Sequence, residues 1–215
     1  MKRVLDNYKP YIKDKKFLKS ILFGFLLIFA SLFVNYYAGL YATERASNSV
    51  TDIVLSNIPV FQVDDVFIYG TFIFWLFISI LCLIKPNRIP FVLKSISVFV
   101  ITRSIFITMT HIGPFPIREI ISGSDLIKKF TFGGDLFFSG HTGLPFLMAL
   151  IFWKEEKVLH WICLGTSLIF GAIVLMGHLH YTIDVLSAFF ITYTIFHISE
   201  RFFAKDRLLF FEKGN

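Results

Sequence analysis

Residues 20–43 read SILFGFLLIFASLFVNYYAGLYAT and contain no Asp, Glu, Lys or Arg. About 20 mainly apolar residues are enough for a helix to cross the hydrocarbon core of a bilayer. A secretory signal would have a shorter apolar core, of about 7–15 residues, followed by a small-residue cleavage site. No clear cleavage site of that kind follows this stretch. The stretch therefore predicts an uncleaved transmembrane helix.

Similar apolar runs follow along the rest of the chain. The third of the six runs is interrupted only by Lys94 and Arg103, and the last two are divided at Gly177-His178-Leu179-His180. We expect an all-α polytopic integral membrane protein with six transmembrane helices in one domain, 20–199, between a basic amino-terminal segment, 1–19, and a basic tail, 200–215. The five further spans are expected at about 66–84, 91–112, 136–153, 158–177 and 180–199.

The composition excludes most other classes of protein. Hydrophobic residues make up 55% of the 215 residues and charged residues only 17%, against about 25% in a typical soluble domain. Phe alone occurs 28 times, more aromatic surface than a soluble fold of this size can bury. Cys82 and Cys163 both lie within apolar runs, so we expect packing residues there and no disulfide.

The basic residues are distributed unevenly between the two sides of the predicted topology. Cytoplasmic segments carry the excess of Lys and Arg, which predicts that both termini face the cytoplasm and that loops 44–65, 113–135 and 177–180 face outward. Charges spaced between apolar runs form no basic stripe, so the net charge of +6 does not indicate a nucleic-acid partner. The outer side holds Arg45, Arg118, Lys128 and Lys129, whereas the inner side holds Lys2, Arg3, Lys9, Lys13, Lys15, Lys16, Lys19, Lys85, Arg88, Lys94, Lys154, Lys157, Arg201, Lys205, Arg207 and Lys213.

Several polar residues lie inside the apolar runs or at their outer ends. Ionisable groups are costly there and are functional candidates by default. The topology brings together residues from the third, fourth and sixth spans near the outer face: Arg103, Asp135, Ser139, His141, His178, His180 and Asp184.

The chemistry of these residues fits phosphoryl transfer through histidine. His180 and Asp184 are four residues apart, which places them on one face of a helix, so the carboxylate can orient the imidazole for attack on phosphorus. His141 suits the general acid that protonates the leaving oxygen. Backbone N–H groups where a helix begins, at Ser139-Gly140-His141, would favour a phosphate.

Each feature also has a simpler interpretation. Any of these histidines could be a packing or interfacial residue, as we expect for His160 and His197. Lys128 and Lys129 could meet only anionic lipid head groups. His178, His180 and Asp184 could bind a metal ion, but phosphoryl transfer through histidine needs none, so we expect no metal and no other cofactor.

Two motifs resemble those of a known family. Residues 134–142, GDLFFSGHT, resemble the G-D-x-x-x-S-G-H-T motif of the sphingomyelin synthase family, within the type 2 phosphatidic acid phosphatase superfamily. Residues 180–188, HYTIDVLSA, are similar to its H-Y-T-x-D-V-x-x-A motif. Two weaker matches are Arg103 with Thr110 and Pro114, and Ile58-Pro59 with Asp64 and Asp65.

The resemblance implies a six-helix membrane enzyme with its site on the exoplasmic face and a triad of His141, His180 and Asp184. It implies that a histidine takes the phospho-head group from a phospholipid donor and passes it to a lipid alcohol acceptor such as ceramide or diacylglycerol. The short chain suggests a bacterial member in the cytoplasmic membrane. We expect the substrate to be bound by Arg103, Asp135, Ser139, Gly140, Thr142, His178 and Tyr181.

The chain departs from the family and superfamily patterns at three positions. Gly133 stands where the family often has Cys. Ile173 and Val174 stand where phosphatase members of the superfamily carry Ser-Arg, which favours the synthase branch. Two alternatives stay open: a lipid phosphate phosphatase or phospholipase C-like hydrolase that uses the same triad with water, and a non-catalytic lipid-binding or transport protein.

Overall fold

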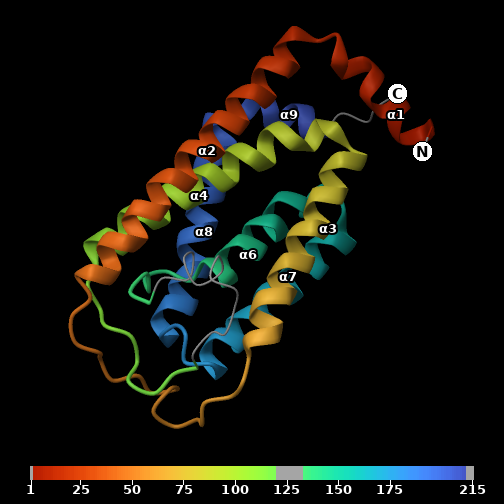
Figure 1. Cartoon of the computed structure of the whole chain (residues 1–215). Coiled ribbons are helices and arrows are strands. Elements are labelled where there is room, and N and C mark those ends of the chain that lie inside the picture. Colours follow the sequence, from red (N-terminus) through yellow and green to blue (C-terminus); the bar gives the residue numbers. More distant parts are fainter. Residues whose placement is uncertain (1, 120–132, 212–215) are drawn as a thin grey trace.

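The computed structural model of the chain describes residues 2–119 and 133–211, and every regular element in these ranges is helical (Figure 1). The prediction of an all-α fold is therefore confirmed. The α-helices are α1 (Lys2–Ile12), α2 (Lys15–Glu44), α3 (Thr71–Ile84), α4 (Ile89–Met109), α6 (Gly140–Phe152), α7 (Lys157–Met176), α8 (Thr182–Phe202) and α9 (Ala204–Phe211). A π-helical turn, η1 (Val66–Gly70), leads into α3, and a 3-10 turn, η2 (Pro86–Arg88), leads into α4.

Five helices within the described residues are long and apolar enough to cross a membrane: α2, η1–α3, η2–α4, α7 and α8. The chain is thus a polytopic integral membrane protein. The predicted fourth span, 136–153, corresponds to the shorter helix α6, which has 13 residues. It begins late because Leu136 and Phe138 stay non-helical and their carbonyl oxygens accept hydrogen bonds from other parts of the chain. The count of six spans stays a prediction.

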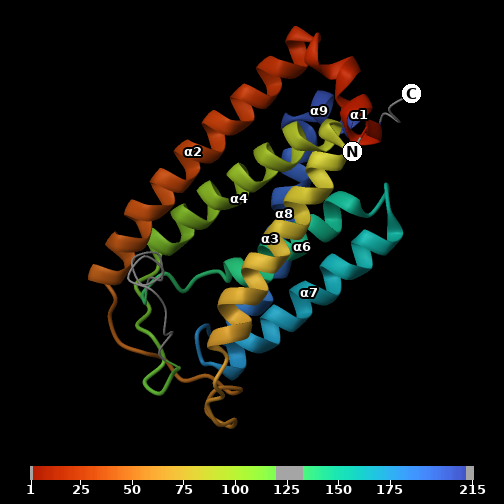
Figure 2. The same cartoon turned by 45° about the vertical axis from the view of Figure 1, so that its right-hand side comes forward.

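The helices form two diverging groups. Helix α2 packs along α4, while α6 packs against α7 and α8. Figure 2 shows α2 and α3 separating from each other toward the loop-bearing end of the bundle. Helices α1 and α9, the first and last of the described residues, lie at one end, and the described parts of the loops that follow α2, α4 and α7 lie at the other (Figure 1). This arrangement is the one that an even number of crossings requires, although the orientation in the membrane stays a prediction.

Small residues explain the close packing of α2 on α4. Gly24, Ser31 and Ala38 are buried at seven-residue intervals, and small side chains let helix backbones approach closely inside a membrane. A Cβ atom on Gly24 would lie 3.2 Å from the Leu93 side chain. The opposite face of α2 exposes large apolar side chains such as Phe25 and Phe29, as expected for a helix that faces lipid.

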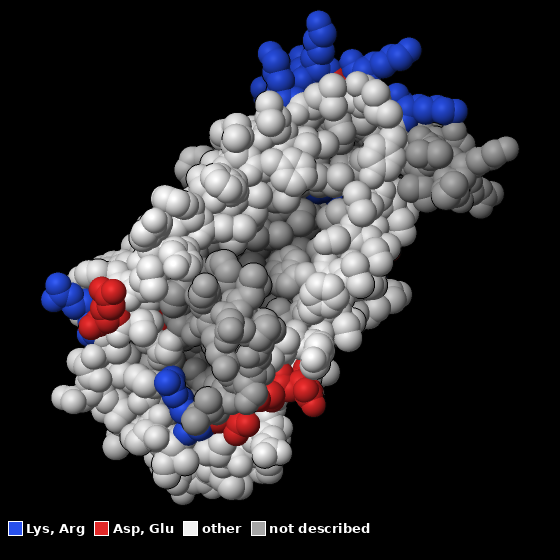
Figure 3. Space-filling view, viewed as in Figure 1, with Lys and Arg blue, Asp and Glu red and all other residues white. Residues whose placement is uncertain are grey.

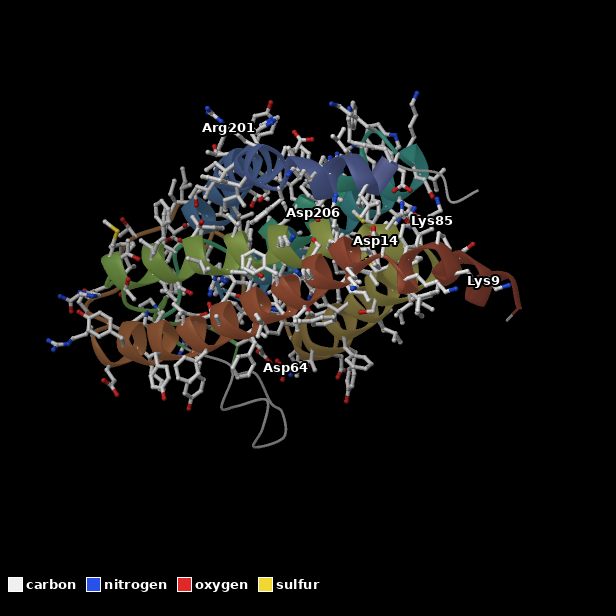
Figure 4. All side chains as sticks on the ribbon, turned by 90° about the horizontal axis from the view of Figure 1, so that it is seen from above. Lys9, Asp14, Asp64, Lys85, Arg201 and Asp206 are labelled. Carbon is white, nitrogen blue, oxygen red and sulfur yellow. The ribbon has the colours of Figure 1, made fainter. Side chains whose placement is uncertain are left out.

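Charged residues crosslink the helices at the end that bears the termini. Lys and Arg gather on the surface there, as Figure 3 shows. Beneath them, Lys94 of α4 forms a buried ion pair with Asp206 of α9, with Nζ 2.6 Å from Oδ2. Figure 4 shows Asp206 between the two ribbons, whereas Arg201 projects away from the bundle. Arg88 likewise pairs with Glu155, at 2.9 Å.

The buried pair predicts a large effect of removing one partner. Asp206→Leu leaves the Lys94 ammonium buried without its counter-charge, and breaking such a pair costs about 3–5 kcal/mol. We expect the Tm of the purified protein in detergent to fall by several degrees, whereas exposed Arg201→Ala leaves it unchanged. Replacing both partners, Lys94→Met with Asp206→Leu, should restore most of the loss. An Asp206→Leu protein as stable as the wild type would show that the ion pair does not fasten α9.

Candidate active site

A cavity of about 620 Å³ lies between α2, α3, α4, α6 and α7. It opens where α2 and α3 diverge, on the face that is hollowed in Figure 3. Much of its wall is aromatic or aliphatic, including Phe74, Trp75 and Leu144. Its polar lining residues are Asn35, Thr71, Arg103, Arg118, Glu119, Asp135, His141 and His180.

His180 lies at the cavity with one ring nitrogen engaged. Its Nδ1 lies 2.9 Å from the Leu136 carbonyl oxygen and 3.2 Å from Oδ2 of Asp184. Because both partners are acceptors, Nδ1 carries the proton and Nε2 is the nitrogen with a free lone pair. The contact predicted from the four-residue spacing is present. It forms across the start of α8 rather than along the helix, since His180 precedes the first residue, Thr182.

Asp184 is fully buried in the first turn of α8. Besides His180, its Oδ2 accepts a hydrogen bond from the backbone N–H of Tyr181 at 3.0 Å. Its backbone carbonyl accepts from the N–H of Ser139 at 3.2 Å, which ties the start of α8 to the start of α6. Asp184 therefore fixes the His180 ring and joins the two motifs, although it does not itself line the cavity.

His141 is the second residue of α6 and lines the cavity. Its imidazole stacks on Phe67 of η1, with ring centroids 4.0 Å apart and planes inclined by 29°. Phe170 of α7 lies nearly perpendicular to it, with ring centroids 6.5 Å apart and planes inclined by 74°. These aromatic contacts hold the ring without occupying its nitrogen atoms, so the nitrogens remain available for proton transfer.

Arg103 reaches from α4 to the segment that precedes α6. Its Nε donates to the Phe138 carbonyl at 2.8 Å, and its Nη2 donates to the backbone carbonyl of Asp135 at 2.6 Å and to that residue's carboxylate at 2.9 Å. Nη1 has no partner among the described residues, and Arg103 lines the cavity. One edge of the guanidinium thus positions the motif while the other is free for an anion.

The remaining motif residues near α6 have clear local roles. Ser139 is the N-cap of α6, and its Oγ accepts hydrogen bonds from the Thr142 N–H at 3.3 Å and the Thr142 hydroxyl at 3.2 Å. Ser139 and Thr142 are fully buried and lie outside the cavity lining. Gly140 does line the cavity, where a Cβ atom would lie 3.4 Å from Nε of Arg103. The predicted helix start at this motif is confirmed.

Tyr181 and His178 tie the loops together rather than line the cavity. The Tyr181 hydroxyl donates to the Gly113 carbonyl at 2.8 Å and accepts from the Val50 N–H at 3.2 Å. His178 adopts a left-handed backbone conformation, φ 53°, and its Nδ1 lies 2.8 Å from the Ile117 carbonyl oxygen. Both side chains therefore hold the loops that follow α2 and α4 against the start of α8.

Asp52 is an important residue that the sequence did not single out. Its carboxylate accepts hydrogen bonds from the backbone N–H and hydroxyl of Thr182, both at 2.7 Å, so it caps α8 from the loop after α2. Burial raises the pKa of Asp52, but hydrogen bonds from Thr182, Leu55 and Val54 outweigh it and hold the pKa below its ordinary value. The sequence offered no signal for this contact, because 130 residues separate the partners.

The histidines and cysteines outside the cavity have the structural roles that were expected for them. His160 is buried with Nδ1 2.9 Å from the Ala149 carbonyl oxygen, and His197 is paired with Glu200 on the surface. Cys82 and Cys163 are buried free thiols, so the expectation of no disulfide is confirmed. Lys128 and Lys129 lie outside the described residues.

The fold and site define an integral membrane protein whose two histidine motifs converge on one cavity. Residues 133–201, which span α6, α7 and nearly all of α8, match the family model described as PAP2 superfamily C-terminal. This part of the chain, which contains both histidine motifs, is therefore similar to that model, and the predicted resemblance to the type 2 phosphatidic acid phosphatase superfamily is confirmed.

Two relatives are more specific. The chain is 37% identical over 91 residues to a phosphatidylinositol:ceramide inositolphosphotransferase of Trypanosoma cruzi, which covers 38% of this chain and 26% of that protein. It is also 35% identical over 87 residues to phosphatidylcholine:ceramide cholinephosphotransferase 1 of Gallus gallus. This match covers 37% of this chain and 21% of that protein. The chain thus matches about a quarter of the length of these relatives. No solved structure matches it significantly.

The cap at Asp52 predicts an acid-sensitive start of α8. A carboxyl group with a lowered folded-state pKa stabilises the folded protein above its unfolded pKa of about 3.9, and this stabilisation is lost as the pH falls through the folded-state value. We expect hydrogen exchange at the Thr182 amide of the wild type to accelerate as the pH falls below about 4, after correction for the intrinsic rate. Asp52→Asn should exchange faster at neutral pH and lack this transition. Identical protection in the two proteins at neutral pH would contradict the cap.

Proposed function

We propose that the chain is a phospholipid head-group phosphotransferase that moves the phospho-head group of a glycerophospholipid to a lipid alcohol. The observation that carries the proposal is the His180 ring, whose Nδ1 is held by Asp184 and Leu136 at a cavity that also contains His141 and Arg103. An oriented imidazole with its second nitrogen free, next to a cation, is the arrangement that nucleophilic attack on a phosphodiester requires.

The proposed first half-reaction transfers the phospho-head group to the enzyme. Nε2 of His180 attacks phosphorus and forms a P–N bond, while the P–O bond to the glycerol oxygen breaks. His141 donates a proton to that oxygen, and diacylglycerol leaves. Asp184 stabilises the positive charge that develops on the imidazole, and Nη1 of Arg103 offsets the negative charge on the phosphoryl oxygens.

In the second half-reaction the acceptor hydroxyl attacks the same phosphorus. His141, now neutral, takes the hydroxyl proton, the new P–O bond forms, and the P–N bond breaks to regenerate His180. The proton that His141 gave to the first product is thereby recovered, so the cycle is balanced and needs no cofactor.

Both relatives are named as transferring a phospho-head group to ceramide, and this supports a lipid alcohol as the acceptor here. Their names give different donors, phosphatidylinositol and phosphatidylcholine. We propose a glycerophospholipid donor and a ceramide or diacylglycerol acceptor, with the site on the outer face of a bacterial cytoplasmic membrane. The uneven distribution of Lys and Arg supports that orientation.

A transfer assay on the full chain in lipid nanodiscs tests the proposal. With head-group-labelled phospholipid, we expect a new labelled lipid to form only when ceramide, or a diacylglycerol whose acyl chains differ from those of the donor, is added. His180→Ala should lower the rate by at least about a thousandfold, and His141→Ala by about 10²–10⁴-fold. His197→Ala, the same substitution at an exposed histidine outside the cavity, should keep the wild-type rate.

Release of the labelled head group at the same rate with and without an acceptor lipid would replace the transferase with a hydrolase, since the first half-reaction is common to both. Lipid transfer or binding that survives His180→Ala would instead favour the non-catalytic alternative.

A further inference from the structure

Asn35 of α2 is a polar residue in the wall of the cavity that the proposed chemistry does not use. It is half-buried and lies in an otherwise apolar stretch of α2, with Leu32 one turn away in the same wall. An unpaired amide in an apolar environment is costly, so a polar residue at such a position marks a functional candidate.

The Asn35 amide is oriented by a neighbouring helix. Its Oδ1 lies 3.4 Å from the Ser104 hydroxyl of α4, whose single proton is shared with a nearer acceptor. The Ser104 hydroxyl also lies 2.8 Å from the Val100 carbonyl oxygen. The Nδ2 group of Asn35, with two N–H donors, has no hydrogen-bond partner among the described residues. The side chain thus offers donors, rather than acceptors, to whatever occupies the cavity.

The depth of Asn35 indicates which part of a lipid it would meet. It precedes the end of α2, at Glu44, by nine residues, which corresponds to about 13 Å along the helix. His141 lies at the start of α6 and His180 just before α8, whereas the apolar lining from Phe74, Trp75 and Leu144 is the part suited to acyl chains. A lipid with its phosphorus at His180 and its acyl chains along the apolar wall would place its ester or amide carbonyl groups between His180 and that wall.

We propose that Asn35 donates a hydrogen bond to a backbone carbonyl of the lipid substrate, the ester of a glycerolipid or the amide of ceramide. A neutral amide suits a carbonyl better than a phosphate, whose charge Arg103 is placed to offset. Asn35 would then be a positioning residue that sets the depth of the lipid in the cavity. This inference rests on the proposed function, because it assumes that the cavity binds a lipid substrate.

Ester- and ether-linked lipids isolate the carbonyl contact. The purified full chain in mixed micelles, loaded with a fluorescent phosphatidylcholine, is titrated with diacyl- and dialkyl-phosphatidylcholine and, separately, with diacylglycerol and dialkylglycerol. We expect the wild type to bind the ester-linked member of one pair about three- to tenfold more tightly, the effect of one net hydrogen bond. The pair that shows the preference identifies the donor or the acceptor as the lipid in contact.

Asn35→Leu should abolish that preference and leave the affinity for the ether-linked lipid unchanged, which also shows that the variant is folded. Asn57→Leu, the same substitution at an exposed Asn outside the cavity lining, is the matched control and should keep the preference. An Asn35→Leu protein that retains the preference, or a wild type with none, would overturn the inference. A wild type that shows the preference but transfers no head group would instead overturn the proposed function alone.

Discussion

The hydrogen bonds of Asp184 connect the two histidine motifs, and the rest of the site depends on this connection. Its carboxylate holds the His180 ring and the Tyr181 backbone, while its carbonyl binds the backbone of Ser139 at the start of α6. A fully buried carboxylate is costly unless its hydrogen bonds offset the loss of solvent. Asp184 therefore constrains the region twice: Oδ2 requires the His180 ring and the Tyr181 N–H beside it, and the carbonyl holds the start of α6 against the start of α8.

Other contacts restrain the same region from the opposite side. Arg103 binds the carbonyls of Asp135 and Phe138, so the segment before α6 is held between α4 and α8. Gly134 in that segment packs against the end of α2, where a Cβ atom would come within 2.7 Å of the Thr43 backbone. A side chain larger than a hydrogen atom at position 134 would displace the segment, so close packing explains the first glycine of the GDLFFSGHT motif. Asp52 and Tyr181 then fasten the loops over the start of α8.

Much of the fold could be predicted because the bilayer imposes simple rules. Apolar length indicated the spans, and the spacing of His180 and Asp184 indicated their contact. The late start of α6 could not be predicted from hydropathy, because the apolar residues Leu136 and Phe138 use their backbone carbonyls to bind His180 and Arg103. Helices α1 and α9, in the segments expected only to be basic and cytoplasmic, were also missed. The position of α9 depends on Asp206 meeting Lys94, 112 residues away.

The site divides in the same way. Of the ten predicted site residues, five line the cavity: Arg103, Asp135, Gly140, His141 and His180. Asp184 acts from behind His180, and Ser139, Thr142, His178 and Tyr181 hold caps and loops. Residues that line the cavity and residues that cap helices or hold loops look alike in a sequence, because the same hydroxyl or imidazole group can serve either role. Asn35 and Asp52 were missed because their partners lie far away in the chain.

Trapping the covalent intermediate is the most direct measurement of the central claim that His180 is the nucleophile. The full chain is incubated with head-group-labelled phospholipid without acceptor, quenched in alkali, which preserves phosphohistidine, and mapped by peptide mass spectrometry. The proposed mechanism predicts a phospho-head group on His180 that disappears when ceramide or diacylglycerol is added before the quench. A turning-over enzyme that carries the label on another residue, or carries no label on His180, would contradict it.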